Sequence, residues 1–224
     1  MKIVRLDQAQ DNEAWLDLRR GKIMGTKAKG VRPLSRGTDK VPIGFWELVA
    51  ERLAIAKDGE PEKERGHRLE NIAITKTGEL FNKEFDLNPG VWVSGVNEDI
   101  AVSPDGAELS LNPTYAAEAK CLDSKNHLKI LLTDRRLQRN EDYRPFDSIP
   151  KEYRDQVVQY FVVNTMLETL YWTLYDDRMA YESLMHHVIV VDREDIEAEI
   201  QEQLEMEVQV LKDVKAIIKE AIHG

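Results

Sequence analysis

Three residues in the middle of the chain have types and a spacing that suit phosphoryl chemistry. Asp105 lies in a Ser-Pro-Asp-Gly sequence, and Glu118 and Lys120 follow in a Glu-Ala-Lys sequence. If residues 115–121 form a strand, Glu118 and Lys120 are two residues apart and point to the same face. A Pro-Asp-Gly turn would bring Asp105 to the same edge of the sheet. We therefore expect two carboxylates and one lysine to meet at this edge.

Such a site calls for a metal ion, because two close carboxylates repel each other unless a cation lies between them. Mg²⁺ is bound through oxygen ligands, so Asp105 and Glu118 would hold it, with the backbone carbonyl of Ala119 as a further ligand. Lys120 would position or deprotonate the attacking water. The alternative is an ordinary salt bridge on an exposed strand, because Glu-x-Lys is a common sequence.

Polar residues on two flanking segments favour the active-site interpretation. Residues 62–80, which contain Glu70, carry apolar residues at three- and four-residue intervals and are predicted to form a helix. Residues 151–168 are also predicted to be helical, and they contain Gln156, Gln159 and Tyr160. These polar groups lie on otherwise half-apolar helices before and after the strand-rich stretch.

The rest of the pattern predicts a mixture of helices and short strands. Helices are expected at 12–20 and 43–57, short strands between Pro89 and residue 121, and further strands at 171–176 and 183–192. A long helix should end the chain, with an apolar stripe from Ile196 to Ile222 that packs on the core or, alternatively, on another subunit.

Residues 125–139 are expected to form a solvated loop. The alternative is that its basic residues contact a DNA backbone: Lys125, Lys129, Arg135, Arg136 and Arg139.

Composition fits one globular domain over residues 1–224, since 42% of residues are hydrophobic and 32% are charged. A single Cys excludes an internal disulfide and a four-cysteine zinc or iron–sulfur site, and it fits a reducing, cytoplasmic compartment. The N-terminus has no apolar run typical of a signal peptide, and no continuous stretch predicts a membrane span.

The net charge of −10 hides a strong polarity along the chain. Residues 19–40 contain eight basic residues and one acid, a balance of +7, whereas residues 192–224 contain ten acids and four bases, a balance of −6. The acidic total therefore does not exclude a nucleic-acid partner, although a solvated basic loop is the simpler explanation of the first segment.

Four motifs occur in a fixed order, and together they resemble those of a known family. They are Gly66-x-x-x-Glu70, Ser-Pro-Asp105-Gly, Glu118-Ala-Lys120 and Gln156-x-x-x-Tyr160. This set is similar to the PD-(D/E)XK nuclease superfamily, and specifically to the phage lambda exonuclease or YqaJ-type viral recombinase family. Segments near residue 15 and from Tyr175 to Met179 also resemble that family, so the resemblance covers most of the chain.

The resemblance implies a fold and an activity. The fold would be α/β (α+β), with a PD-(D/E)XK restriction-endonuclease-like core, a mixed central β-sheet flanked by helices and a long C-terminal helix. The activity would be a 5′-to-3′ exonuclease that degrades one strand of linear double-stranded DNA, releases 5′-phosphomonoesters and leaves 3′ single-stranded overhangs for phage-type recombination. The enzyme would need Mg²⁺, with Mn²⁺ as a substitute and two ions per active site. It would form a ring-shaped homotrimer and work with a single-strand annealing protein.

The resemblance also implies roles for individual residues. Asp105 and Glu118 would bind metal, Lys120 would be the catalytic lysine, and Glu70 would support the metal site. Gln156 is the better match for the motif glutamine. Gln159 is the alternative, because this helix has one extra residue relative to the corresponding helix of lambda exonuclease.

At the DNA, Arg19 and Thr26 would bind the 5′-phosphate, with Trp15 and Tyr160 also assigned to DNA binding. One position departs from the family. An aspartate expected on the strand before the Ser-Pro-Asp-Gly sequence falls near Gly95, and Glu98 or Asp99 could replace it only in a shifted register.

Three other readings of the sequence stay open. An endonuclease or a Cas4-like end-processing nuclease would share the motifs, although a single Cys argues against the iron–sulfur form. A non-catalytic DNA-end-binding partner would share the fold, although all three residues of the proposed centre are present.

His186 and His187 are expected to be structural because neighbours on a strand point to opposite faces, and Cys121 is expected to be a small buried residue.

Overall fold

The computed structural model describes residues 62–223, so the helices expected at 12–20 and 43–57 lie outside the described residues. The first described element is helix α3 (Glu62–Phe81), and a two-stranded hairpin of β1 (Trp92–Val93) and β2 (Ala101–Val102) follows it. A second group of strands comprises β3 (Gly106–Ala107), β4 (Tyr115–Lys120), β5 (Thr169–Tyr175) and β6 (His186–Asp192). Helices α4 (Ser124–Leu137), α5 (Pro145–Ser148) and α6 (Lys151–Val163) separate β4 from β5, and α7 (Glu197–His223) ends the chain.

The main sheet has the order β3-β4-β5-β6 and mixes both strand directions. β3 and β4 are antiparallel, β4 and β5 are parallel, and β5 and β6 are antiparallel. In the parallel pair Glu118 lies beside Trp172 and Lys120 beside Leu174. The carboxyl ends of β4 and β5 therefore meet at one edge, which is where parallel strands commonly place functional groups.

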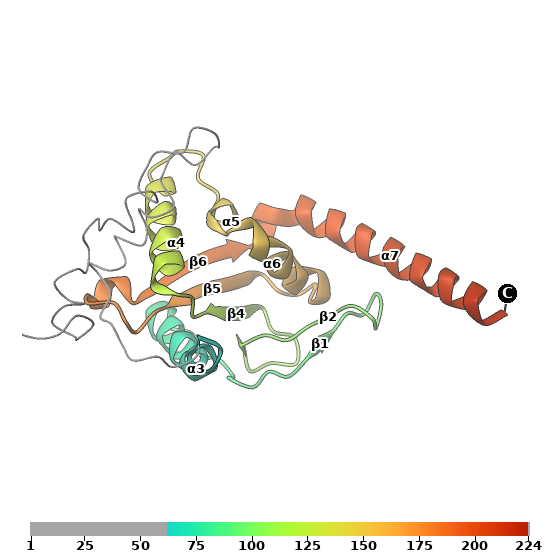
Figure 1. The fold of residues 1–224 in the computed structure, drawn as a ribbon, viewed down its shortest axis with the longest axis horizontal. Helices are drawn as coiled ribbons and strands as arrows, with labels where there is room; N and C mark the ends of the chain where they lie inside the picture. The colour runs from blue at the N-terminus through green and yellow to red at the C-terminus, as the bar shows by residue number, and fades with distance from the viewer. Residues whose placement is uncertain (1–61, 224) are drawn as a thin grey trace, which may run out of the picture.

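Helices cover both faces of this sheet (Figure 1). Leu69 and Ile74 of α3 pack on the face formed by Ala117 and Tyr171. The opposite face, which includes Trp172, packs on α5, α6 and the start of α7. The mixed sheet, the flanking helices and the long terminal helix confirm the fold class that the sequence resemblance implies.

Helix α3 forms and ends where its sequence dictates. Leu69, Ala73 and Thr77 repeat at four-residue intervals and are buried against the sheet. The helix ends at Phe81, and the next residue, Asn82, has a φ of 51°, the left-handed conformation that Asn adopts more readily than most residues. The N–H of Lys83 then donates to the carbonyl oxygen of Gly78 at 2.9 Å, which closes the last turn. Glu70 is thereby held on a well-defined helix.

The expected loop at 125–139 is wrong, because most of that stretch is helix α4. The Asp123 side chain caps this helix by accepting a hydrogen bond from the N–H of Asn126 at 2.9 Å. Leu128 and Leu131 are fully buried, so one face of the helix packs on the molecule while its basic residues point outward. The many Lys and Arg residues favoured a solvated loop, although Leu128 and Leu131 have the three-residue spacing of a helix face.

Helix α7 packs on the core through the face that carries Ile200, Leu204 and Leu211. Ile196 and Ile200 are buried and Leu204 is partly buried, as the apolar stripe predicts. Farther along, Val208 and Val210 are exposed, and the helix projects away from the sheet (Figure 1). Within residues 62–223, no helix combines the length and apolarity that crossing a membrane requires.

Candidate active site

The turn before β3 brings Asp105 to the end of β4, as the sequence predicts. Its Oδ2 atom accepts a hydrogen bond from the backbone N–H of Ala119 at 2.8 Å. The N–H and C=O of one strand residue point to the same edge, so the carbonyl of Ala119 also faces the side of β4 on which Asp105 lies. Asp105 and this carbonyl are thus placed as neighbouring oxygen donors.

Close packing of Gly106 fixes the position of Asp105. A Cβ atom on Gly106 would lie 2.6 Å from Cγ2 of Ile74 on α3, which is closer than real Cβ contacts allow. Only glycine therefore lets the strand approach the helix at this point. This explains physically why the residue after the aspartate is glycine.

Glu118 is the centre of the polar network. It is only 4% exposed, and its Oε1 atom accepts hydrogen bonds from Nζ of Lys120 at 2.6 Å and from Nε2 of Gln156 at 2.7 Å. Its Oε2 atom accepts a short hydrogen bond from the hydroxyl of Tyr160. Burial together with these donors fixes the carboxylate in one orientation.

The ion pair between Lys120 and Glu118 differs from the exposed salt bridge that the sequence left as an alternative, because Glu118 is buried and Lys120 is largely covered. The Lys120 Nζ atom also lies 5.3 Å from the centroid of the Tyr153 ring on α6. Tyr153, Gln156 and Tyr160 are spaced three and four residues apart and form one face of α6. Tyr153 was missed as a candidate, although this spacing from Gln156 could have revealed it.

The electrostatics of the site favour a cation. Burial raises the pKa of Asp105 to about 7, and the negative charges of Glu118 and Glu70 add to this effect. The N–H of Ala119 and the charge of Lys120 act in the opposite direction. A carboxyl whose ionisation is opposed by two other carboxylates binds a divalent cation readily, since the cation offsets the repulsion.

The donor set fits Mg²⁺ better than a metal that needs a complete protein cage. Among the described residues, no group of three or more His, Cys, Asp or Glu side chains is arranged to hold a metal. Mg²⁺ is usually bound by one or two carboxylates, with waters and substrate phosphates completing the octahedron. Asp105, Glu118 and the carbonyl of Ala119 can supply the protein part of such a shell.

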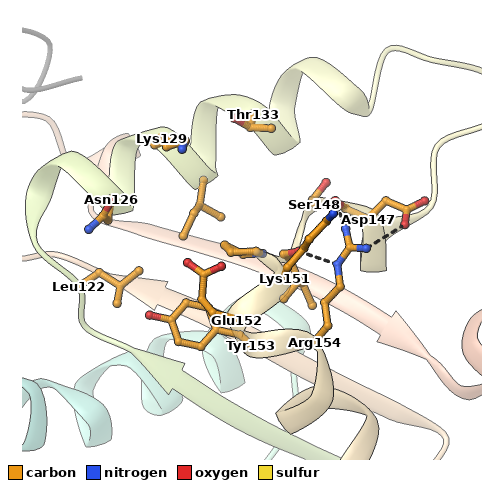
Figure 2. A pocket seen from close by; sticks show the side chains of 13 residues that line it. Leu122, Asn126, Lys129, Thr133, Asp147, Ser148, Lys151, Glu152, Tyr153 and Arg154 are labelled. Atoms are coloured by element: carbon orange, nitrogen blue, oxygen red, sulfur yellow. Dashed lines mark hydrogen bonds and ion pairs between the residues drawn. The ribbon is translucent and has the colours of Figure 1, made fainter. Parts of the chain in front are cut away.

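A pocket of about 510 Å³ lies between helices α4 and α6 (Figure 2). Leu122 and Tyr153 line it, together with Lys129 of α4 and Lys151 of α6. Figure 2 shows Arg154 turned toward Asp147, and its Nη2 atom donates to the Asp147 carbonyl at 2.8 Å. The pocket therefore carries basic groups from two helices, and it shares with the site only the Tyr153 ring, whose centroid lies 5.3 Å from Nζ of Lys120.

The structure separates the two candidate glutamines. Gln156 reaches Glu118, whereas the side chain of Gln159 accepts a hydrogen bond from Gln203 at 2.5 Å and donates to Glu207 at 3.3 Å. Gln159 therefore joins α6 to α7, and of the two glutamines it is Gln156 that contacts Glu118.

The assignment of Tyr160 to DNA binding needs correction. Its side chain is fully buried, with its ring against Trp92 and its hydroxyl on Glu118, so a DNA strand cannot touch it. Tyr160 instead supports Glu118 from behind. The sequence could not show whether Tyr160 faces DNA or Glu118, because it predicts only that Gln156 and Tyr160 share one helix face.

Other candidates lie elsewhere. Glu98 and Asp99 are exposed in the turn between β1 and β2, so the structure gives neither of them the place of the aspartate that the family carries near Gly95. Trp15, Arg19 and Thr26 lie outside the described residues, and their assignment to DNA stays a prediction.

The histidines and the cysteine have structural surroundings. Nε2 of His186 lies 3.0 Å from the Thr173 hydroxyl, and Nε2 of His187 lies 2.8 Å from Asp134, so the two rings point apart as expected. Burial raises the pKa of the Cys121 thiol to about 12, which keeps it protonated and unreactive as a nucleophile.

The family follows from the sequence match that accompanies this geometry. A model of the YqaJ-like viral recombinase domain matches residues 14–167, which include all four motifs. The chain belongs to this family. No curated protein matches the sequence.

Solved structures share the fold of this YqaJ-like protein. The crystal structure of an alkaline exonuclease, LHK-Exo from Laribacter hongkongensis, is 18% identical, with a TM-score of 0.54 and coverage of 94% of this chain and 98% of its own. The structure of LHK-Exo in complex with dAMP is 21% identical, with a TM-score of 0.50 and coverage of 92% and 100%. At this identity the likeness establishes the fold, while the chemistry rests on the residues described above.

Proposed function

We propose that this YqaJ-like protein is a Mg²⁺-dependent exonuclease that degrades one strand of linear double-stranded DNA from its 5′ end. One observation carries the proposal: Asp105, Glu118 and Lys120 meet at the carboxyl end of β4, and Gln156 and Tyr160 hold Glu118 in place. Two solved structures of an alkaline exonuclease with this fold, one of them with dAMP, support the choice of a nucleotide substrate.

The residues divide the hydrolysis of a phosphodiester. Asp105, Glu118 and the Ala119 carbonyl would hold Mg²⁺, or Mn²⁺ in its place, and up to two ions per site. When bound, the metal polarises the phosphate and stabilises the leaving oxygen. Lys120, held 2.6 Å from Glu118, orients the attacking water and favours its deprotonation through its positive charge. Attack at phosphorus then releases a 5′-phosphomonoester and leaves the 3′-oxygen on the departing nucleotide.

Glu70 contributes through charge rather than through a ligand bond in this proposal. Its charge opposes ionisation of Asp105, so it strengthens the preference of the site for a cation. Gln156 and Lys120 both donate to Oε1 of Glu118, so the remaining lone pair of Oε2, beside the Tyr160 bond, is the one that would face the metal.

Family membership supports a proposal for the larger assembly. We infer that the protein forms a ring-shaped homotrimer around DNA and supplies 3′ single strands to an annealing protein for recombination. Arg19, Thr26 and Trp15 would bind the 5′ end, and the charge of +7 between residues 19 and 40 supports that role.

Digestion of linear duplex DNA labelled separately at each 5′ and 3′ end tests the proposed function. Incubation with Mg²⁺ should release the 5′ label first and leave long single strands, and EDTA should stop the reaction. A closed circle of the same sequence should stay intact. Cutting of the circle would indicate an endonuclease instead, and binding of ends without digestion would indicate a non-catalytic partner.

A further inference from the structure

A buried ionic cluster contacts the backbone that directly follows the end of β4. We define the Asp176 cluster as Asp176, Arg65, Arg178 and Ser124. Asp176 follows β5, and the parallel register that sets Lys120 beside Leu174 brings it close to Leu122. The carboxylate of Asp176 is fully buried and the Arg65 residue is 3% exposed.

Every oxygen of Asp176 is occupied by donors from different elements. Oδ1 accepts from Nη2 of Arg65 at 2.5 Å and from Nε of Arg178 at 2.9 Å. Oδ2 accepts from the hydroxyl of Ser124 at 2.6 Å. One carboxylate thus joins the first turn of α3, the end of β5 and the start of α4.

The two guanidinium groups then hold the segment that follows Lys120. Nη1 of Arg65 donates to the carbonyl oxygens of Cys121 at 3.2 Å and Leu122 at 3.3 Å. Nη2 of Arg178 donates to the same Leu122 carbonyl at 3.0 Å. The backbone immediately after Lys120 is therefore fixed by three charge-assisted hydrogen bonds.

Stability alone is a poor reason for such a cluster. Burying two charges costs much of what their attraction returns, and apolar side chains of similar volume often fill such a space at no loss of stability. What apolar side chains cannot do is hold two backbone carbonyls at a set position. The cluster also joins α3, which carries Glu70, to the strand that carries Lys120.

We propose that the Asp176 cluster positions Lys120 and Glu70 for the reaction by fixing the carbonyls of Cys121 and Leu122. The inference rests on the proposed nuclease function for its kinetic consequence, and it assigns Asp176, Arg65 and Arg178 as positioning residues. A displacement of about 1 Å in a catalytic group lowers rates by as much as 100-fold, so small shifts of this segment have large effects.

The test compares Asp176→Asn with Asp134→Asn. Asp134 is an equally buried carboxylate with three hydrogen-bond donors, Tyr143, Gln138 and His187, on the far part of α4. Both variants should lose comparable folding stability. Asp176→Asn should lower kcat on linear duplex DNA by roughly tenfold or more while KM stays within about threefold, and Asp134→Asn should keep kcat within about threefold of wild type.

Amide hydrogen exchange supplies a readout that does not depend on activity. In Asp176→Asn the amides between Glu118 and His127 should exchange faster than global unfolding accounts for, and in Asp134→Asn they should not. If Asp176→Asn does not fold, Arg178→Met removes one bond to Leu122 from a more accessible position and should show the same local effect, more weakly. If Asp176→Asn or Arg178→Met folds and shows both the amide exchange and the kcat of wild type, the proposal is overturned. If the wild-type protein does not digest DNA, the proposed function fails, while the exchange measurement still decides whether the cluster holds this segment.

Discussion

At the scale of single residues, Glu118 explains how the site stays ordered before any substrate arrives. Its two oxygens accept from three side chains, one on its own strand and two on α6. A buried carboxylate is stable only when its lone pairs are satisfied in this way. The cost of ordering the site is thus met during folding, which is what preorganised electrostatic catalysis requires.

Asp105→Asn should abolish the response of the protein to Mg²⁺ without unfolding it. Wild type should gain thermal stability on addition of Mg²⁺, because a ligand that binds only the folded state raises Tm. The variant should show no such gain, and its metal-free Tm should equal or exceed that of wild type because a charge opposed by Glu118 and Glu70 has been removed. Differential scanning calorimetry with and without Mg²⁺ measures both effects. A Mg²⁺-dependent rise of equal size in both proteins would remove Asp105 from the metal site.

Tyr160→Phe should weaken the site as well as the fold. The variant leaves one oxygen of Glu118 without its hydroxyl donor, at a cost of about 2 kcal/mol in the free energy of unfolding. We expect nuclease activity to fall by roughly tenfold. Tyr143→Phe is the matched control, because that hydroxyl donates to buried Asp134 at 2.6 Å. Full activity in Tyr160→Phe would show that Glu118 needs no support from α6.

Sequence spacing predicted the residues on β4 and its neighbouring turn better than those on α6. A strand fixes alternation, so Glu118 and Lys120 had to share a face once the strand was assumed. Helix α6 offered Gln156, Gln159 and Tyr160 within five residues, and only the angle at which the helix packs decides which of them reach Glu118. That angle depends on contacts with α7 and the sheet, which are distant in sequence.

At the scale of elements, the parallel pair of β4 and β5 determines where the proposed active site and the Asp176 cluster lie. Glu118 and Lys120 point to the α6 face, and Asp176 follows the neighbouring strand at the same edge. The short strands and α3 could be predicted from local patterns. Helix α4 could not, because its buried face contributes few residues and its charged face dominates the composition.

His186 of β6 contacts the hydroxyls of Thr77 on α3 and Thr173 on β5, and its burial predicts that the stability of the protein depends on pH. Burial lowers the pKa of His186 to about 4, and the nearby charge of Lys76 acts in the same direction. The unfolded chain takes up this proton near pH 6.5, so between pH 6.5 and 4 it binds more protons than the folded state. The free energy of unfolding should therefore fall as pH falls through this window, by roughly 1 to 2 kcal/mol from this group.

His186→Gln should reduce that loss. Glutamine keeps a polar contact to Thr77 and Thr173 but does not titrate. Urea unfolding at pH 7 and pH 4 compares the two proteins. An identical loss of stability in wild type and variant would assign the acid sensitivity to other groups, His127 among them.

At the scale of the whole molecule, helix α7 projects away from the sheet and the helices that cover it (Figure 1). The outer part of α7 leaves Met206, Val208 and Val210 exposed. Among the described residues, core packing thus accounts for Ile200, Leu204 and Leu211 of the predicted apolar stripe but not for Val208. Sequence periodicity could not separate the stripe residues that meet the core from those that are exposed, because an apolar stripe has the same spacing whether it packs on the core or on another surface.

The proposed ring predicts a specific mass in solution. Three chains of 25.8 kDa should give a particle of about 77 kDa by light scattering during size-exclusion chromatography. The mass should not change over a tenfold dilution if the ring is the working form. A particle of 25.8 kDa that still digests DNA would contradict the trimer and leave the active site untouched.

The most direct test of the central claim is single-turnover cleavage of end-labelled linear duplex DNA by Lys120→Ala. Lys212→Ala, a change at an exposed lysine on α7, serves as the matched control. With Mg²⁺ present, Lys120→Ala should bind DNA within about threefold of wild type but cleave it at least about 100-fold more slowly, whereas Lys212→Ala should cleave normally. Cleavage by Lys120→Ala at a rate near that of wild type would contradict the assignment of Asp105, Glu118 and Lys120 as the active site.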